Sequence, residues 1–246
     1  MEQLNGKTAL ITGGAKRLGR AFANALAAEG ANVVIHYNRS VREAESLAEE
    51  LAGTGVRAWA IQANLANFDE AASLPARAQD VAGPIDFIIN SASIFPESTL
   101  RDVTPEAIHT NLDINALSPF LIGRAFAELG RPGAIVNMLD CMIADYDRKH
   151  IAYHLSKQAL FSLTRMMAVE FAPLVRVNAI APGLVLPPAG KDESYLAGLA
   201  STNPLNRYGS AGDVAAAAVF LLKSTFITGQ VIYVDGGRNL RGAMYG

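Results

Sequence analysis

The stretch TALITGGAKRLG, residues 8–19, decides the fold. Its first part, Thr8–Thr12, is an apolar and β-branched run that is typical of a buried strand. Gly13 and Gly14 follow directly, and glycine is the residue that a tight turn or a close backbone approach requires. Residues 18–29 then have the alanine-rich composition of a helix. A strand, a glycine turn and a helix in this order indicate the beginning of an α/β domain.

The same alternation of short apolar strands and longer helical patterns continues along the chain. Six further strands are expected at residues 32–37, 56–62, 85–90, 134–138, 175–180 and 230–234. Further helices are expected at residues 41–51, 68–81, 105–129, 151–171 and 213–223, and Pro119 predicts a kink or a break in the long one. Strands this apolar are buried on both faces of a parallel sheet. The expected fold class is α/β, a single-domain Rossmann-type doubly wound parallel sheet of about seven strands with helices on both faces.

The bulk composition excludes several classes of protein. A formal net charge of −2 over 246 residues leaves no basic excess for nucleic-acid binding. Cys141 is the only cysteine, so no disulfide forms within the chain, and no cluster of Cys and His predicts a metal site. The N-terminus lacks a basic segment followed by an apolar run, and no apolar run is long enough to span a bilayer. We expect one cytoplasmic domain, residues 1–246, that binds neither nucleic acid nor membrane.

Residues 183–207 break the alternation of strands and helices. They connect a predicted strand to a predicted helix and are rich in proline, with Pro187, Pro188 and Pro204. A connection of this length inside a compact domain is usually a lid or a binding loop. We expect this segment to close over a substrate, and we refer to it as the substrate loop.

The glycine turn has the features of a nucleotide phosphate site. The helix that follows it offers unpaired N–H groups and a positive dipole end to a phosphate, although an ordinary glycine-rich turn is the alternative. The second strand ends in HYNRS, residues 36–40, without the acid that would accept bonds from the ribose hydroxyls of NAD. Arg39 offers a planar fork for a phosphate, Ser40 a hydroxyl and Lys16 a positive charge. These residues favour NADPH, unless Arg39 is simply a solvated residue of the turn.

Tyr153 and Lys157 are four residues apart, so they share one face of the predicted helix. An ammonium held beside a phenol favours the phenolate and lowers the pKa of the phenol from its usual value of about 10. Such a pair is suited to proton transfer. A surface pair is the alternative, but the position of these residues after the fifth predicted strand favours the chemical interpretation.

Together these motifs resemble those of the short-chain dehydrogenase/reductase family, and the resemblance covers essentially the whole chain. The turn TGGAKRLG resembles the family's T-G-x-x-x-G-x-G coenzyme loop, with Arg17 where the middle glycine normally stands. NSAS, residues 90–93, resembles the family's N-N-A-G segment. Asn115 matches the helix asparagine that helps to relay protons through water to the lysine. Pro182 and Gly183 match the turn that meets the nicotinamide carboxamide.

The resemblance also implies which residues hold the coenzyme. Asn64 and Leu65 stand where an Asp-Val or Asp-Leu pair normally frames the adenine. The implied residues of the NADPH site are Gly13, Lys16, Arg17, Leu18, Gly19, Tyr37, Asn38, Arg39, Ser40, Asn64, Leu65, Asn90, Ser91, Ala92, Ser93, Tyr153, Lys157, Pro182, Gly183 and Leu184.

Asp140 departs from the family pattern. A serine usually stands thirteen residues before the tyrosine and hydrogen-bonds a substrate carbonyl, but this chain has Asp140 there. A carboxylate would repel the alkoxide that develops in ketone reduction, whereas it suits a ring with nitrogen atoms and N–H donors. A structural aspartate is the alternative. Arg17, HYNRS, Phe95 and Asp140 together resemble the pteridine reductases, and DRKHIAYHLSK and GGRNLRG look closest to the bacterial dihydromonapterin reductases, or alternative dihydrofolate reductases.

The resemblance implies a hydride transfer from NADPH to a dihydropterin, which is dihydromonapterin, dihydrobiopterin or dihydrofolate. Its implied catalytic residues are Asn115, Asp140, Tyr153 and Lys157, and its implied substrate-binding residues are Arg17, Ser93, Phe95, Asp140 and Tyr153. Two other functions remain open, a generic NADPH-dependent carbonyl or 3-oxoacyl reductase and an inactive NADP-binding sensor. The two long predicted helices resemble those at the family's dimer interfaces, so a homotetramer is expected, with a dimer as the alternative.

Overall fold

Seven parallel strands form one sheet in the order β3-β2-β1-β4-β5-β6-β7. The strands are β1 (Thr8–Thr12), β2 (Asn32–Tyr37), β3 (Ala58–Gln62), β4 (Phe87–Asn90), β5 (Gly133–Met138), β6 (Val175–Pro182) and β7 (Val231–Val234). The computed structural model describes residues 2–188 and 190–243, so Ala189 of the substrate loop lies outside the described residues. The strand order reverses between β1 and β4. In such sheets ligands bind at this point, beyond the carboxyl ends of the strands.

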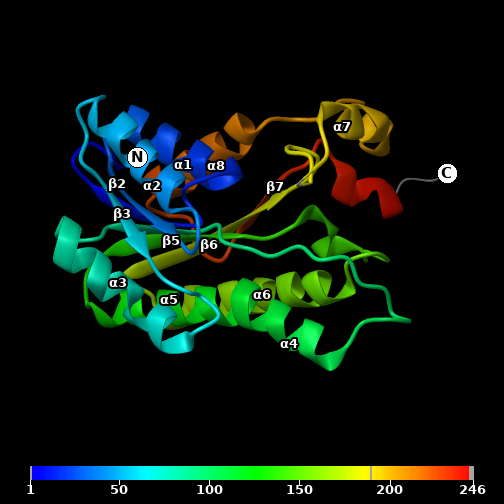
Figure 1. The fold of residues 1–246 in the computed structure, drawn as a ribbon, viewed down its shortest axis with the longest axis horizontal. Coiled ribbons are helices and arrows are strands. Elements are labelled where there is room, and N and C mark those ends of the chain that lie inside the picture. The colour runs from blue at the N-terminus through cyan, green and yellow to red at the C-terminus, as the bar shows by residue number, and fades with distance from the viewer. Residues whose placement is uncertain (1, 189, 244–246) are drawn as a thin grey trace.

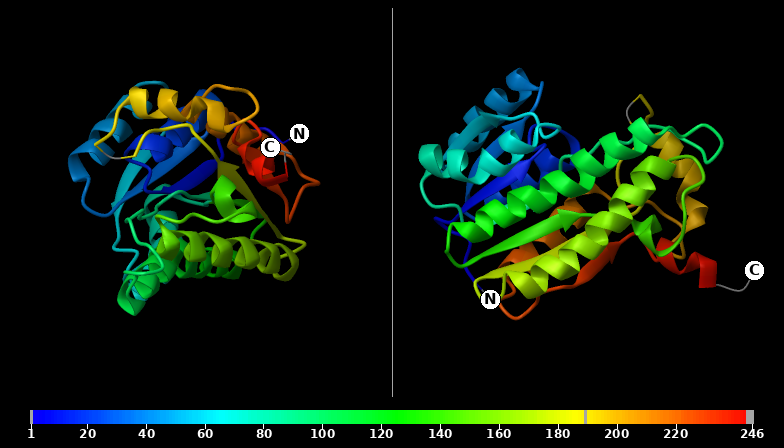
Figure 2. Two further views of the ribbon diagram at one scale, coloured as in Figure 1. Left: turned by 90° about the vertical axis from the view of Figure 1, so that its right-hand side faces the viewer. Right: turned by 90° about the horizontal axis from the view of Figure 1, so that it is seen from below.

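Helices form a layer on each face of the sheet (Figure 1). One layer consists of α1 (Arg17–Ala28), α2 (Val41–Ala52) and α8 (Ala211–Lys223). The other layer consists of α3 (Phe68–Ala82), α4 (Pro105–Leu112), α5 (Ser118–Glu128) and α6 (Ile151–Glu170). A further short helix, α7 (Glu193–Leu199), lies at one end of the sheet near the C-terminal segment (Figure 2). None of the helices among the described residues is long and apolar enough to cross a membrane.

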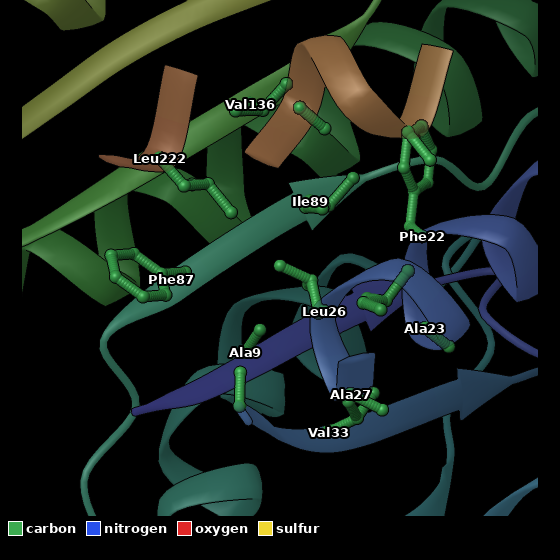
Figure 3. Packing of buried hydrophobic residues seen from close by; sticks show 14 of the residues in the cluster. Ala9, Phe22, Ala23, Leu26, Ala27, Val33, Phe87, Ile89, Val136 and Leu222 are labelled. Carbon is green, nitrogen blue, oxygen red and sulfur yellow. The ribbon is translucent and has the colours of Figure 1, made fainter. Parts of the chain in front are cut away.

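The central strand β1 shows why the strands are apolar on both faces. Ala9 and Ile11 belong to a buried cluster with α1 and α8, whereas Leu10 between them belongs to a second cluster with α3, α5 and α6. Successive side chains of a strand point to opposite faces, so each face needs its own apolar set. Figure 3 shows the first cluster, in which Leu26 of α1 lies between its helix and the strands. The predicted α/β fold class is confirmed.

Most predicted elements lie where the sequence places them, and two differences concern the site. The predicted helix over residues 105–129 is interrupted by a π-helical turn, Asp113–Leu117, between α4 and α5. Pro119 has no N–H to donate to the carbonyl of Asn115, and this lost bond accounts for the irregular turn just before the proline. The second difference is α7, which forms inside the substrate loop. Asp192 caps its first turn, since its side chain accepts from the N–H of Ser194 at 3.0 Å.

Candidate active site

Asp140 and Tyr153 form a hydrogen-bonded pair at the carboxyl end of β5. Asp140 follows this strand closely, and Tyr153 lies in the first turn of α6. The Tyr153 hydroxyl donates to Asp140 Oδ2 at 3.1 Å. The second oxygen of Asp140 accepts from the N–H of Met142 at 2.8 Å, because Asp140 caps the short 3₁₀ turn that follows. Both oxygens of the carboxylate are therefore held in place, and one of them faces the phenol.

Lys157 lies one helical turn beyond Tyr153 and is almost completely buried. Its ammonium donates to the carbonyl of Met138 at 2.7 Å and lies 5.5 Å from the centre of the Tyr153 ring. Burial lowers the pKa of Lys157 from 10.5 to about 8, against the opposing effect of the Asp140 charge. The last strand residue and the helix thus fix the lysine beneath the tyrosine.

The predicted lowering of the Tyr153 pKa is wrong for this structure. Burial raises the pKa of Tyr153 well above its usual value, and the negative charge of Asp140 raises it further. Burial also raises the pKa of Asp140, and its hydrogen bonds with Met142 and Tyr153 oppose that rise. Burial of the phenol is the main reason for the error, and Asp140 adds to it by placing a carboxylate beside the phenol. Tyr153 and Asp140 consequently both retain protons more strongly than they would in water.

Asn115 lies in the π-helical turn and joins two parts of the site. Its side-chain NH₂ donates to Ser156 Oγ of α6 at 3.0 Å and to the carbonyl of Ile94 at 3.0 Å. Its side-chain oxygen accepts from the N–H of Ile94 at 2.9 Å and from Ser93 Oγ at 3.1 Å. The Asn115 side chain therefore holds the segment that follows β4 against α6. Ser93 and Phe95 belong to that segment.

Phe95 forms a flat wall beside the pair. Its side chain is 44% exposed, and its ring meets the Tyr153 ring edge-on with centroids 4.6 Å apart at 86°. On one face it stacks against His150, with ring centroids 3.9 Å apart at 18°. The sequence predicted Phe95 at the site but gave no such place to His150.

The glycine turn is packed too closely to accept side chains. Gly13 has a φ of +62°, and a Cβ atom there would lie 2.9 Å from the Cα of Ala92. A Cβ atom at Gly19 would lie 2.1 Å from the carbonyl oxygen of Gly13, so α1 begins directly on the turn. Thr12 Oγ1 accepts from the N–H groups of Ser91 at 3.0 Å and Ala92 at 3.1 Å. Thr12 thereby ties the turn to the segment after β4, a role that the sequence reasoning missed.

His36, in the HYNRS segment expected near the adenosine, makes contacts that the sequence did not predict. It is buried at the end of β2, where Nδ1 accepts from the N–H of Gly13 at 3.1 Å. Nε2 therefore carries the hydrogen and donates to the carbonyl of Ala63 at 3.0 Å, just before Asn64 and Leu65. Burial lowers the pKa of His36 to about 4, so the ring stays neutral at ordinary pH. One imidazole thus joins the glycine turn to the segment that is expected to frame the adenine.

The residues expected at the adenosine end lie together on the surface. Tyr37 ends β2, residues 38–40 form the exposed or partly exposed turn that follows, and α2 begins directly after it. Lys16 pairs with Glu43 of α2, with 2.5 Å between Nζ and Oε1. The ion pair partly neutralises the positive charge of Lys16. Because both side chains are about half exposed, it contributes little to the stability of the fold. Leu18, also expected here, packs against the first core cluster.

The residues expected at the nicotinamide end have different roles. Asn90 is buried, and its NH₂ group donates to Asn137 Oδ1 at 2.9 Å, so its side chain links β4 to β5. Gly183 follows β6, which ends with Pro182, and a Cβ atom on it would lie 2.7 Å from the Cβ of Asp235. Any side chain at position 183 would clash with Asp235, so glycine is required there.

Leu184 joins the start of the substrate loop to its end. Its carbonyl accepts from the N–H of Gly209 at 2.9 Å. The segment between them therefore leaves the sheet and returns at nearly the same place.

Arg17 connects the glycine turn to the substrate loop. Its φ is +53°, in the left-handed region where the family's usual glycine is free of strain. Its guanidinium Nη2 donates to the carbonyl of Pro187 at 2.6 Å, across 170 residues of sequence. A side chain other than glycine costs about 1–2 kcal/mol in this conformation. The backbone strain at Arg17 is therefore the cost of placing a long donor side chain that reaches the carbonyl of Pro187.

Two substitutions of Arg17 separate strain from contact. Arg17→Ala removes the bond to Pro187 and retains the strain, whereas Arg17→Gly removes both. Because the strain is worth about 1–2 kcal/mol and glycine adds about 0.5–1 kcal/mol of unfolded-state entropy, we expect Arg17→Gly to be the more stable variant by up to about 1 kcal/mol. Urea unfolding measures both. If Arg17→Gly were less stable than Arg17→Ala, the backbone at residue 17 would not be strained.

The whole arrangement is suited to giving protons to a flat molecule. Phe95 supplies a flat surface, and the pair beside it retains protons that a substrate can accept. In the part of the chain that the structure describes, no group of three or more His, Cys, Asp or Glu side chains is placed to hold a metal ion.

Comparisons with known proteins show which families and structures the chain resembles. Residues 13–239 match the protein family described as Enoyl-(Acyl carrier protein) reductase. A crystal structure of FolM alternative dihydrofolate reductase 1 from Brucella canis, complexed with NADP, superimposes with a TM-score of 0.89 at 32% identity and covers 97% of this chain and 96% of its own. A 3-oxoacyl-[acyl-carrier-protein] reductase FabG of Staphylococcus aureus is 34% identical over 240 residues, which are 94% of this chain and 97% of that protein. An uncharacterized oxidoreductase of Methylorubrum extorquens is 32% identical over 96% of this chain and 99% of its own.

Proposed function

Because the chain belongs to the short-chain dehydrogenase/reductase family, we propose that it is an NADPH-dependent oxidoreductase that reduces a dihydropterin to its tetrahydro form. Dihydromonapterin, dihydrobiopterin and dihydrofolate are the candidate substrates. The observation that carries the proposal is the hydrogen bond between Tyr153 and Asp140. It places a carboxylate where a ketone reductase needs a neutral donor. The likeness to a FolM alternative dihydrofolate reductase supports the same substrate class.

The helix ends around the glycine turn fit the coenzyme. α1 and α2 begin without a side-chain cap, at Lys16 and Ser40, whereas Asn67 and Thr104 cap α3 and α4. An uncapped helix start offers N–H groups and a positive dipole end to a phosphate. We assign the pyrophosphate to the start of α1. The phosphate on the adenosine ribose is assigned to Arg39 and Ser40 at the start of α2.

NADPH, when bound, supplies the hydride, and the side chains of this chain bind the substrate and supply protons. Phe95 stacks against the flat ring and sets its plane. Asp140 accepts N–H bonds from the ring, and Asp140 and Tyr153 give protons to ring nitrogens. Their raised pKa values suit this direction, because a group that donates must be protonated before it reacts.

Lys157 and Asn115 maintain the proton donors. The ammonium of Lys157 lies under the Tyr153 ring and stabilises negative charge that develops on the phenol after it gives up a proton. A relay to Lys157 begins at the carbonyl of Asn115 in the π-helical turn, since Pro119 has no N–H to donate to that carbonyl. Water connects the two groups in this proposal.

A generic carbonyl or 3-oxoacyl reductase is the second candidate, because the FabG relative shares most of the chain's length. Asp140 argues against it. When it is ionised, a buried carboxylate beside the phenol opposes the negative oxygen that forms when a ketone is reduced, because the two charges are weakly screened there. An inactive NADP-binding protein is disfavoured because Asp140, Tyr153 and Lys157 are assembled with donor and acceptor in contact.

Parallel assays of NADPH oxidation test the function. The purified protein is given dihydromonapterin, dihydrobiopterin, dihydrofolate and a set of ketones that includes a 3-oxoacyl thioester, at equal concentrations. We expect turnover of at least one dihydropterin with a kcat/KM at least about 100-fold above that of any ketone, as one general acid contributes. Turnover of ketones alone would assign the protein to the second candidate, and no turnover of any compound would favour a binding protein.

We also propose a homotetramer, from the resemblance to family members whose long helices form the interfaces. The exposed side of α6 supports it, since Met166 and Val169 are 64% and 79% exposed there. Large apolar side chains that gather on one helix face are typical of a contact between subunits. The mass of the protein in solution, measured by light scattering, decides between monomer, dimer and tetramer.

A further inference from the structure

The stack of His150 on Phe95 has no part in the proton chemistry described above. The two rings are nearly parallel, at 18°, and their centroids are 3.9 Å apart. At this distance the rings touch, so His150 covers one face of Phe95. Phe95 nevertheless remains 44% exposed, so part of the residue stays accessible beside this stack. A flat substrate that stacks on Phe95 therefore uses the face opposite His150.

His150 is held in place by its own segment. Its Nδ1 donates to Asp147 Oδ2 at 2.8 Å, and the other oxygen of Asp147 accepts from the N–H of Lys149 at 2.7 Å. Asp147 is thus bound at both oxygens, and it fixes the plane of the imidazole. A ring with a fixed plane can fix the plane of the ring stacked on it.

The backbone that carries Phe95 is joined to the backbone that carries His150. The N–H of Ser98 donates to the carbonyl of Lys149 at 2.7 Å, and the N–H of Ile151 donates to the carbonyl of Ser98 at 3.0 Å. Ser98 Oγ also accepts from the N–H of Ala152 at 3.2 Å. These three bonds join the loop after β4 to the first turn of α6. The distance between the two rings is therefore set by the backbone as well as by the rings.

We propose that His150, oriented by Asp147, is a positioning residue for the substrate: it backs Phe95 and keeps the ring of Phe95 in the plane on which a flat heteroaromatic substrate stacks. This inference rests on the proposed function, because it takes the pterin as the flat substrate. It concerns binding of the ring and not transfer of protons. Its loss should consequently raise KM for the pterin more than it lowers kcat.

Three variants test the role of His150. His150→Ala removes the backing ring and is expected to raise KM for the dihydropterin about 3- to 10-fold, the effect of one aromatic pair. kcat is expected to fall less than KM rises, and the Kd for NADPH is expected to stay within twofold of the wild type. His150→Phe keeps a ring at the same place and should restore most of the affinity. His109→Ala, which changes an exposed histidine on α4, is the matched control.

Direct binding of a fully oxidised pterin, biopterin, gives a second readout. Stacking quenches its fluorescence, and the titration yields Kd without turnover. A weaker Kd in His150→Ala that His150→Phe restores supports the inference. An unchanged Kd and KM in His150→Ala would overturn it, and so would an equal loss of NADPH affinity, which indicates a general structural role. A wild-type protein that neither binds nor reduces pterins would overturn the proposed function, which the wild-type assay reports separately from the variants.

Discussion

Asp140→Asn is expected to lower kcat/KM for a dihydropterin by about 100- to 1,000-fold, as the loss of a general acid does. Asparagine has nearly the same shape, but its single side-chain oxygen can accept from only one of the two present donors, the N–H of Met142 or the Tyr153 hydroxyl. It has no proton to give to a ring nitrogen, and it cannot accept N–H bonds on both of its terminal atoms. The rate is measured as the loss of NADPH absorbance at saturating coenzyme.

Two further variants distinguish an effect on the chemistry from an effect on folding. Asp140→Ser restores the residue that the family usually has, and it should lose pterin reduction far more than it loses NADPH binding. Asp80→Asn removes an exposed carboxylate from α3, far from β5 along the chain, and should leave both unchanged. Pterin turnover by Asp140→Asn equal to that of the wild type would remove Asp140 from the mechanism and, with it, the main argument against ketone reduction.

The two Asp140 variants should be more stable than the wild type although they are less active. Burial raises the pKa of Asp140, so the ionised form is less favourable in the folded protein than in the unfolded chain. Between the usual pKa of a carboxyl group and this raised value the folded state binds more protons, and the free energy of unfolding falls as pH rises. The ionised form of Asp140 thus opposes folding, as charges of functional groups often do.

The parts of the fold that local sequence determines were predicted well. Runs such as Thr8–Thr12 coincide with strands because a strand buried on both faces needs apolar side chains toward each face, here Ala9, Leu10 and Ile11. The glycine turn was predictable because Gly13 and Gly19 occupy places that no side chain fits. Asp140 was found for a different reason. It breaks a family pattern at a position whose usual residue has a known chemical task.

The missed features depend on contacts between distant segments. His36 joins Gly13 to Ala63, and His150 stacks on Phe95 across 55 residues, and no local pattern encodes either contact. The pKa of Tyr153 was predicted in the wrong direction because the sequence shows Lys157 one helical turn away, but it shows neither how deeply the phenol is buried nor how near Asp140 comes. An i and i+4 spacing fixes a shared face, but burial, together with the charge beside the phenol, decides the sign of the pKa shift.

Lys157→Met is the substitution with the second large expected effect. It keeps the length of the side chain and removes the charge that stabilises the phenol of Tyr153, so we expect kcat/KM to fall by about 100- to 1,000-fold. The folded protein should not become less stable. Burial lowers the pKa of Lys157 from 10.5 to about 8, which corresponds to about 3 kcal/mol against folding when the amine is charged at neutral pH. The carbonyl of Met138 loses its donor in the variant, and this costs about 1–3 kcal/mol in return.

The dependence of stability on pH gives the sharper form of this prediction. Between pH values of about 8 and 10.5 the unfolded chain holds a proton on Lys157 that the folded protein has released. The unfolded state binds more protons there, so the free energy of unfolding of the wild type should rise with pH across this window, by up to about 3 kcal/mol. Lys157→Met should lack this rise, and urea unfolding at about pH 7 and about pH 10 measures both proteins. A wild type that loses stability over the same window relative to the variant would mean that the ammonium is stabilised in the folded protein, and the lysine would then contribute to the fold as well as to the chemistry.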